Sequence, residues 1–172
     1  MSQVIARSTS FAYSRSLSTD IPLAALAGRI LLSAIFIIAG IMKFADWQGT
    51  AQYMEAKHMP LIPLLLPAAA LVELGGGLAL LLGLESRWMA LALFLFLTPT
   101  TLIFHNFWAY VGVEQQHQLQ QFFKNLAIMG GLALIVGLGP GSASLDAWLA
   151  GLRDSRLRPA IREHGPLTRT SG

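Results

Sequence analysis

The stretch LAALAGRILLSAIFIIAGIMKF, residues 23–44, is apolar almost throughout, and its charged residues are Arg29 and Lys43. Helical residues rise about 1.5 Å each, so about 20 of them cross a membrane core about 30 Å thick. A helix satisfies its own backbone hydrogen bonds in lipid, and the run lacks the alternation of a barrel strand. The chain has four such runs, and we expect membrane-spanning helices at about residues 23–42, 61–83, 88–105 and 122–139.

The composition of the whole chain is that of an integral membrane protein. Of its 172 residues, 54% are apolar and 12% are charged, and the mean hydropathy is +0.57. About a quarter of the residues in a soluble domain are charged. We therefore predict an all-α fold, a four-helix bundle embedded in the lipid bilayer. The net charge of +3 does not indicate nucleic-acid binding, because the basic residues flank the apolar runs.

The sequence divides into a polar N-terminal tail at residues 1–22, the bundle at 23–140 and a basic C-terminal tail at 141–172. The first tail is rich in serine and poor in acidic residues, which fits either a short tail of a bacterial protein or a mitochondrial transit peptide. Lysine and arginine concentrate on the cytoplasmic side of membrane proteins. Three lysines lie on one side and eight arginines lie on the side of the two termini, which predicts that both termini are cytoplasmic. These arginines are Arg7, Arg15, Arg87, Arg153, Arg156, Arg158, Arg162 and Arg169.

Two features of the connectors and spans predict departures from straight, spanning helices. Residues 44–60 place apolar side chains at near-helical spacing, which predicts a short amphipathic helix at the membrane interface, anchored by Trp47 and Tyr53. Pro67 and Pro99 lie inside the second and third runs, where a missing backbone donor bends a helix.

Arg29 and Glu73 form the candidate intramembrane polar pair. An ionised side chain in hydrocarbon costs at least a few kcal/mol, so such residues usually face the interior and find a partner. Arg29 shares a helix face with Ser33 and Lys43, and Glu73 shares one with small residues, so we expect the two charges to meet. A pair that fixes helix register, a neutral Glu73, a proton relay and a head-group contact all remain open.

A second polar group is expected at the opposite end of the bundle. Its members end the first and third runs or begin the fourth: Lys43, His105, Asn106, Lys124 and Asn125. Such side chains suit a polar or anionic head group, such as a quinone ring or a phosphate. The alternative is that the lysines extend to the interface and the neighbouring aromatic residues form a belt there.

Several kinds of site are excluded by the sequence. The chain has no cysteine, which removes disulfides, thiolate nucleophiles and iron–sulfur clusters. Of the histidines, only His105 lies near a span, so neither a di-histidine haem nor a metal site is predicted. Any redox role would therefore need a bound cofactor or a partner protein.

Four segments together resemble the DoxX family of small membrane proteins. They are RILLSAIFIIAGIMKF at 29–44, VELGGGLALLLG at 72–83, HNFW at 105–108 and FFKNLAIMGGL at 122–132. The similarity extends over about residues 23–140. The polar members of the shared patterns are Arg29, Lys43, Glu73, His105, Lys124 and Asn125.

The resemblance implies a multi-pass protein of the bacterial inner (plasma) membrane. Some members of the family are associated with quinone-linked sulfur or terminal oxidase systems, or with membrane complexes that manage oxidative stress. The first hypothesis is therefore a non-catalytic or quinone-contacting subunit that meets membrane redox partner proteins, with enzyme activity of its own left open. The second is a proton or small-solute transport component using Glu73, and the third is a structural assembly factor. Four spans are few for a transporter, an objection that assembly of the chain into a homodimer or other homo-oligomer would relax.

Overall fold

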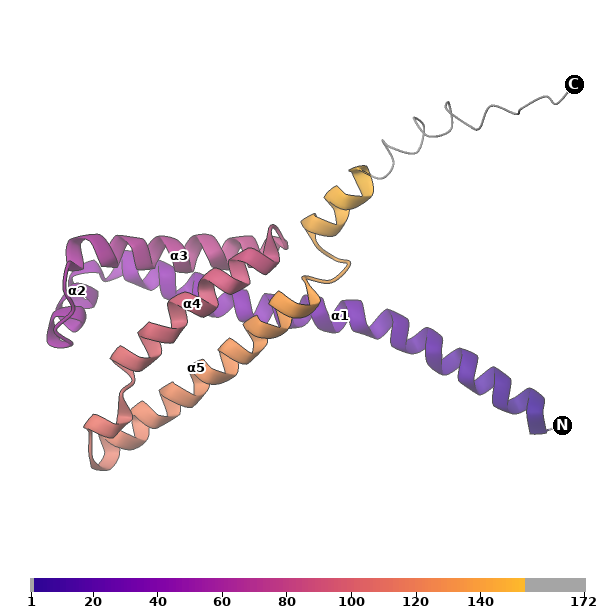
Figure 1. Ribbon diagram of the computed structural model, residues 1–172, viewed down its shortest axis with the longest axis horizontal. Helices are drawn as coiled ribbons and strands as arrows, with labels where there is room; N and C mark the ends of the chain where they lie inside the picture. The colour runs from indigo at the N-terminus through magenta and orange to yellow at the C-terminus, as the bar shows by residue number, and fades with distance from the viewer. Residues whose placement is uncertain (1, 154–172) are drawn as a thin grey trace, which may run out of the picture.

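The computed structural model describes the backbone of residues 2–153 and the side chains from Pro22 onward, and within that range it contains helices and no strand (Figure 1). This confirms the all-α prediction. The elements are α1 Ser2–Ala45, α2 Trp47–Ala56, α3 Ile62–Leu82, α4 Ser86–Phe104, the 3-10 helix η1 Phe107–Ala109 and α5 Gly112–Leu138. Residues 145–153 add further helical turns.

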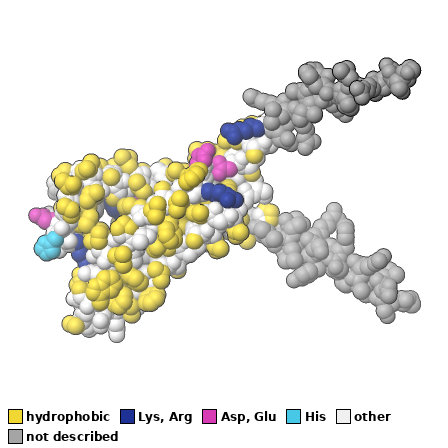
Figure 2. All heavy atoms as spheres, viewed as in Figure 1, with side chains coloured by type: hydrophobic (Ala, Val, Ile, Leu, Met, Phe, Trp, Pro, Cys, Tyr) yellow, Lys and Arg dark blue, Asp and Glu magenta, His cyan; other side chains and the backbone are white. Residues whose placement is uncertain are grey.

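Four helices are long and apolar enough to cross a membrane, as the sequence predicted. They span Pro22–Ala45, Ile62–Leu82, Ser86–Ala109 and Gly112–Leu138 among the described residues. Many of their large apolar side chains point outward; Leu31, Leu95 and Leu134 are all well exposed. Figure 2 shows hydrophobic side chains over most of the visible face, with acidic and basic ones near its ends. That surface is suited to lipid.

Two helices begin earlier than the apolar runs predicted. α1 starts at Ser2, so most of the segment assigned to a polar tail continues the first helix; residues 1–22 contain no glycine that would break it. α5 starts at Gly112, well before residue 122. Its first turns are polar but made of good helix formers, and hydropathy finds only the part of a helix that faces lipid. The short helix predicted within residues 44–60 is α2, and its place at the membrane interface stays a prediction.

The bundle consists of two helix pairs. α1 packs along α3 and α4 packs along α5, and α3 joins the pairs by packing on α4. Glycine permits the close approach of α1 and α3: a Cβ on Gly40 would lie 2.8 Å from the Leu74 backbone nitrogen, and one on Gly77 would lie 3.0 Å from that of Ile37. Small residues commonly allow such contacts in membranes. The apolar core comprises Phe36, Leu80, Ala90, Leu93, Leu97, Leu132 and Ile135.

The bundle has two different ends. At the Arg29 end lie the start of span one, the α3–α4 turn at residues 83–85 and the segment 139–146 that follows α5. At the Lys43 end lie α2 and η1, and there the α4–α5 pair diverges from the α1–α3 pair (Figure 1). The core fills the half of the bundle nearer the Arg29 end, so the divergence leaves space at the other end.

Candidate functional site

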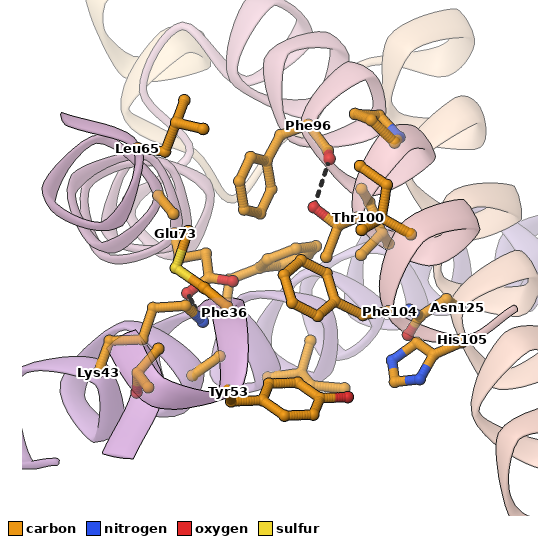
Figure 3. Close-up of a pocket in the computed structure, with 18 of the residues that line it drawn as sticks. Phe36, Lys43, Tyr53, Leu65, Glu73, Phe96, Thr100, Phe104, His105 and Asn125 are labelled. Atoms are coloured by element: carbon orange, nitrogen blue, oxygen red, sulfur yellow. Dashed lines mark hydrogen bonds and ion pairs between the residues drawn. The ribbon is translucent and has the colours of Figure 1, made fainter. Parts of the chain in front are cut away.

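A cavity of about 510 Å³ lies at the Lys43 end of the bundle. Side chains from α1, α2 and α3 form one wall and those from α4 and α5 form the other (Figure 3). Pro99, which removes a backbone donor inside α4, lies on the diverging part of that helix and lines the cavity. Most of the lining is apolar, including Phe36, Leu65, Phe96, Leu97, Phe104 and Ile128. The space is thus suited to a largely apolar molecule.

An ion pair between Lys43 and Glu73 lies on the α1–α3 wall. The Lys43 Nζ is 2.6 Å from a Glu73 carboxylate oxygen, and Glu73 is only 6% exposed. Both residues line the cavity, and Figure 3 shows them together on one side of it. Lys43 is the one polar side-chain partner of Glu73 among residues 22–153. The pair therefore holds two opposite charges at the edge of an apolar space.

The expected contact between Arg29 and Glu73 is wrong, because the register of α1 and α3 separates them. Gly40 lies against Leu74, and Gly77 lies against Phe36 and Ile37, which puts position 41 of antiparallel α1 level with Glu73. Lys43 is two residues from that level. Arg29 is twelve residues away, or about 18 Å along the helix axis.

Arg29 instead fixes the segment after α5. Its guanidinium donates to the Pro140 carbonyl at 2.8 Å and to the Ala143 carbonyl at 2.6 Å, and the residue is 3% exposed. A Cβ on Gly83, whose φ is +71°, would lie 2.8 Å from an Arg29 nitrogen, so glycine is required there both by conformation and by space. Arg29 thus holds the segment after α5 against this end of the bundle.

Asp146 joins the same segment to the turn between α3 and α4. Its carboxylate accepts hydrogen bonds from the backbone nitrogens of Glu85 at 2.8 Å and Ser86 at 3.1 Å, where α4 begins. The Asp146 nitrogen donates to the Gly83 carbonyl at 3.0 Å. Burial would raise the pKa of Asp146, but the bonds from Ser86 and Glu85 and the charge of Arg29 hold it below its usual value.

The predicted outer polar cluster is largely brought together. Lys43, His105, Lys124 and Asn125 all line the cavity. Asn106 does not; its side-chain oxygen accepts from Lys57 Nζ at 3.4 Å, outside the cavity. Four of the five residues chosen from the sequence thus share one site, although the role of that site stays a prediction.

Comparison with known proteins assigns the chain. A family model described as DoxX matches residues 24–106. The "Inner membrane protein YqjF" of Escherichia coli (strain K12) is 42% identical over 124 residues, which are 72% of this chain and 90% of that protein. The chain belongs to the DoxX family.

The other relatives agree with this assignment. The E. coli "Inner membrane protein YphA" is 32% identical over 125 residues, 73% of this chain and 89% of that protein. A "Surfeit locus protein 4 homolog" of Drosophila melanogaster is 29% identical over 70% of this chain but only 39% of its own length. No solved structure matches. The protein is thus a multi-pass DoxX-family protein of the inner membrane.

The DoxX-family match covers the α1–α3 wall of the cavity and most of the α4 side. It includes Lys43, Glu73 and His105 and ends before Lys124 and Asn125. The cavity is therefore built mainly from the part of the chain that defines the family.

Three lining or supporting residues were missed as site residues in the sequence. Tyr53 was expected as an interfacial anchor, but it lines the cavity with its ring 5.3 Å from that of Phe104; burial raises the pKa of its phenol, which stays neutral. Thr100 also lines the space. Gln118 bonds to His105 at 2.9 Å. Gln118 precedes Asn125 by two helical turns, so a search for polar residues on one helix face would have found it.

The donor set of the site does not suit a metal ion. Among the described residues no three histidine, cysteine, aspartate or glutamate side chains group together. Ligand pockets that combine an apolar lining with a few placed polar groups commonly bind organic molecules, and this cavity has that character.

Proposed function

We propose that this inner-membrane protein binds a quinone at the Lys43 end and acts as a quinone-contacting subunit of a membrane redox or oxidative-stress assembly. The observation that carries the proposal is the cavity of about 510 Å³ with an apolar lining and four polar side chains from the predicted cluster. A quinone combines a flat ring, carbonyl acceptors and an apolar tail, and each part has a counterpart in this space.

The ring and its carbonyls fit the inner part of the cavity. Phe36, Phe96 and Phe104 supply aromatic surfaces, and Figure 3 shows these rings between the two polar walls. Aromatic rings pack favourably in stacked or edge-to-face arrangements. Lys43 and Lys124 offer ammonium donors to carbonyl oxygens.

The tail fits the rim of the cavity. Ile35 and Ile103 line the space, and they are 36% and 38% exposed on the outer surface of the bundle. The cavity therefore reaches the surface that faces lipid, so a long apolar tail has an exit that does not cross the core.

The polar residues support holding a quinone better than they support moving protons. A proton path using Glu73 would have to continue to the Arg29 end, but Leu80, Leu93 and Leu132 of the core are fully buried there. Lys43 also engages the Glu73 carboxylate in an ion pair. Since the chain has no cysteine, we assign electron transfer onward to partner subunits, with this chain as the holding component.

With both termini in the cytoplasm, as the arginine distribution predicts, the cavity opens on the periplasmic half of the membrane. Quinones are membrane-soluble, so the ligand would enter from the bilayer at that depth.

A pair of adjacent alanines on α3 gives a direct test. Ala69 lines the cavity, whereas Ala68 is exposed and does not. Ala69→Phe should fill the space and weaken decyl-ubiquinone binding by about tenfold or more, because overpacking costs about 1–3 kcal/mol. Ala68→Phe, the matched control, should bind as wild type does. Binding is measured by titration of the protein in lipid nanodiscs. Wild type that binds no quinone, or equal binding by both variants, would overturn the proposal.

A further inference from the structure

A chain of hydrogen bonds leads from the surface to the cavity along the start of α5. Gln118 Nε2 donates to a Glu114 carboxylate oxygen at 2.7 Å, and Gln118 Oε1 lies 2.9 Å from His105 Nδ1. Gln118 is buried, and His105 lines the cavity. This series of hydrogen bonds ends at the His105 imidazole, whose Nε2 has no hydrogen bond to any described residue.

The directions of these bonds are fixed by chemistry. A carboxylate only accepts hydrogen bonds, so the amide NH₂ of Gln118 must face Glu114. The amide oxygen then faces His105, and an oxygen requires a donor opposite it. His105 is therefore held with its proton on Nδ1, and the neutral ring presents Nε2 as an acceptor.

A second acceptor on the same wall is oriented in the same way. The Thr101 hydroxyl donates to the Leu97 carbonyl at 2.7 Å, so its oxygen accepts from Asn125 Nδ2 at 3.1 Å. Asn125 is 6% exposed and lines the cavity. One N–H of its amide is thus engaged with Thr101, and its Oδ1, which has no hydrogen bond to a described residue, is an acceptor that this wall offers to a ligand.

We infer that the α4–α5 wall selects the reduced form of the ligand, a quinol, through hydroxyl donors that bond to His105 Nε2 and Asn125 Oδ1. The inference rests on the proposed quinone site and adds the redox state that this site prefers. A quinone has only acceptors, so it would cover both groups without pairing them, and an acceptor that a ligand covers and leaves unpaired costs binding energy. Glu114 and Gln118 are positioning residues, since they act through the tautomer of His105.

The test compares decyl-ubiquinol with decyl-ubiquinone, under anaerobic conditions, on the full chain in nanodiscs. Wild type should bind the quinol about tenfold more tightly. Histidine labelled with ¹⁵N should show His105 protonated at Nδ1, assigned by the signal that His105→Gln removes.

Glu114→Lys is the informative variant because it reverses the direction of the hydrogen bonds from residue 114 through Gln118 to His105. An ammonium only donates, so the Gln118 oxygen would turn toward it and the NH₂ toward His105. The ring proton would then move to Nε2, which becomes a donor to a quinone carbonyl. We expect exchanged nitrogen signals and a quinol preference that is lost or reversed. Glu55→Lys makes the same charge change on an exposed residue of α2 and should leave both readouts unchanged.

The outcomes separate this inference from the proposed function. Wild type that binds neither form would overturn both. Equal binding of the two forms would overturn the selection alone, and so would a Glu114→Lys protein that exchanges the tautomer without changing the preference. If Glu114→Lys does not fold, Gln118→Leu removes the oriented amide and should give mixed tautomers and no preference; an unchanged preference there would also refute the inference.

Discussion

Replacing Arg29 with methionine should release the segment that follows α5. Arg29 makes two hydrogen bonds to the Pro140 and Ala143 carbonyls, and bonds to a charged group contribute about 1.5–3 kcal/mol each. The freed carbonyls would regain water at the membrane surface, so we expect about 2–4 kcal/mol of the total to be lost. That corresponds to opening that is about 30- to 1000-fold more frequent.

Hydrogen exchange measures this opening directly. The reporting amides are those of Asp146 and Trp148, which bond to the carbonyls of Gly83 and Ser144. Arg87→Met is the matched control, because Arg87 is an exposed arginine at the same end with no hydrogen bond from its side chain to a described residue. If Arg29→Met and Arg87→Met leave these amides equally protected, the role of Arg29 in holding the segment after α5 is refuted.

Two further predictions concern Asp146 and the helix interface. Because the folded pKa of Asp146 is lowered, its stabilising contribution is present above about pH 4 and lost as the pH falls through the folded value. In wild type, the opening that amide exchange reports, after correction for the intrinsic exchange rate at each pH, should increase in acid. Asp146→Asn should not show this increase. Gly77→Ala should destabilise the protein by about 1–3 kcal/mol, because its Cβ would lie 2.9 Å from Ile37 Cγ1. Gly75→Ala, with nothing within 4 Å, should not lower the melting temperature in detergent; equal losses would contradict the packing argument.

The membrane fold could be predicted from the sequence because it follows from local composition. Each span needs only enough apolar residues in a row to cross a bilayer, and that property does not depend on tertiary contacts. The first turns of α5 were not predicted for the same reason, since the turns that contain Glu114 and Gln118 are helical but not apolar. Hydropathy therefore locates the helices and misses their polar ends, where the site is supported.

The polar partners depend on register, and a single sequence contains little information about register. Arg29 and Lys43 lie on one face of α1, so face analysis selected both. The packing places position 31 level with Gly83 at the end of α3, whereas the first apolar run begins at residue 23. This offset of about two helical turns places Lys43, and not Arg29, beside Glu73. The grouping of Lys43, His105, Lys124 and Asn125 could be predicted, because residues near the same ends of the spans lie at a similar depth in the membrane whatever the register.

The two ends of the bundle have opposite physical requirements, and the different partners of Arg29 and Glu73 show how they differ. A cavity in a membrane bundle tends to collapse, because packing drives helices together. Here α3 and α4 are held at the Arg29 end by a short turn, which Asp146 bonds to the segment after α5. With that end fixed, closing the Lys43 end would bring the half-buried Lys43 and the buried Glu73 toward the polar groups of α5. Arg29 and Asp146 thus hold one end of the bundle together, and Lys43 and Glu73 line the space at the other end.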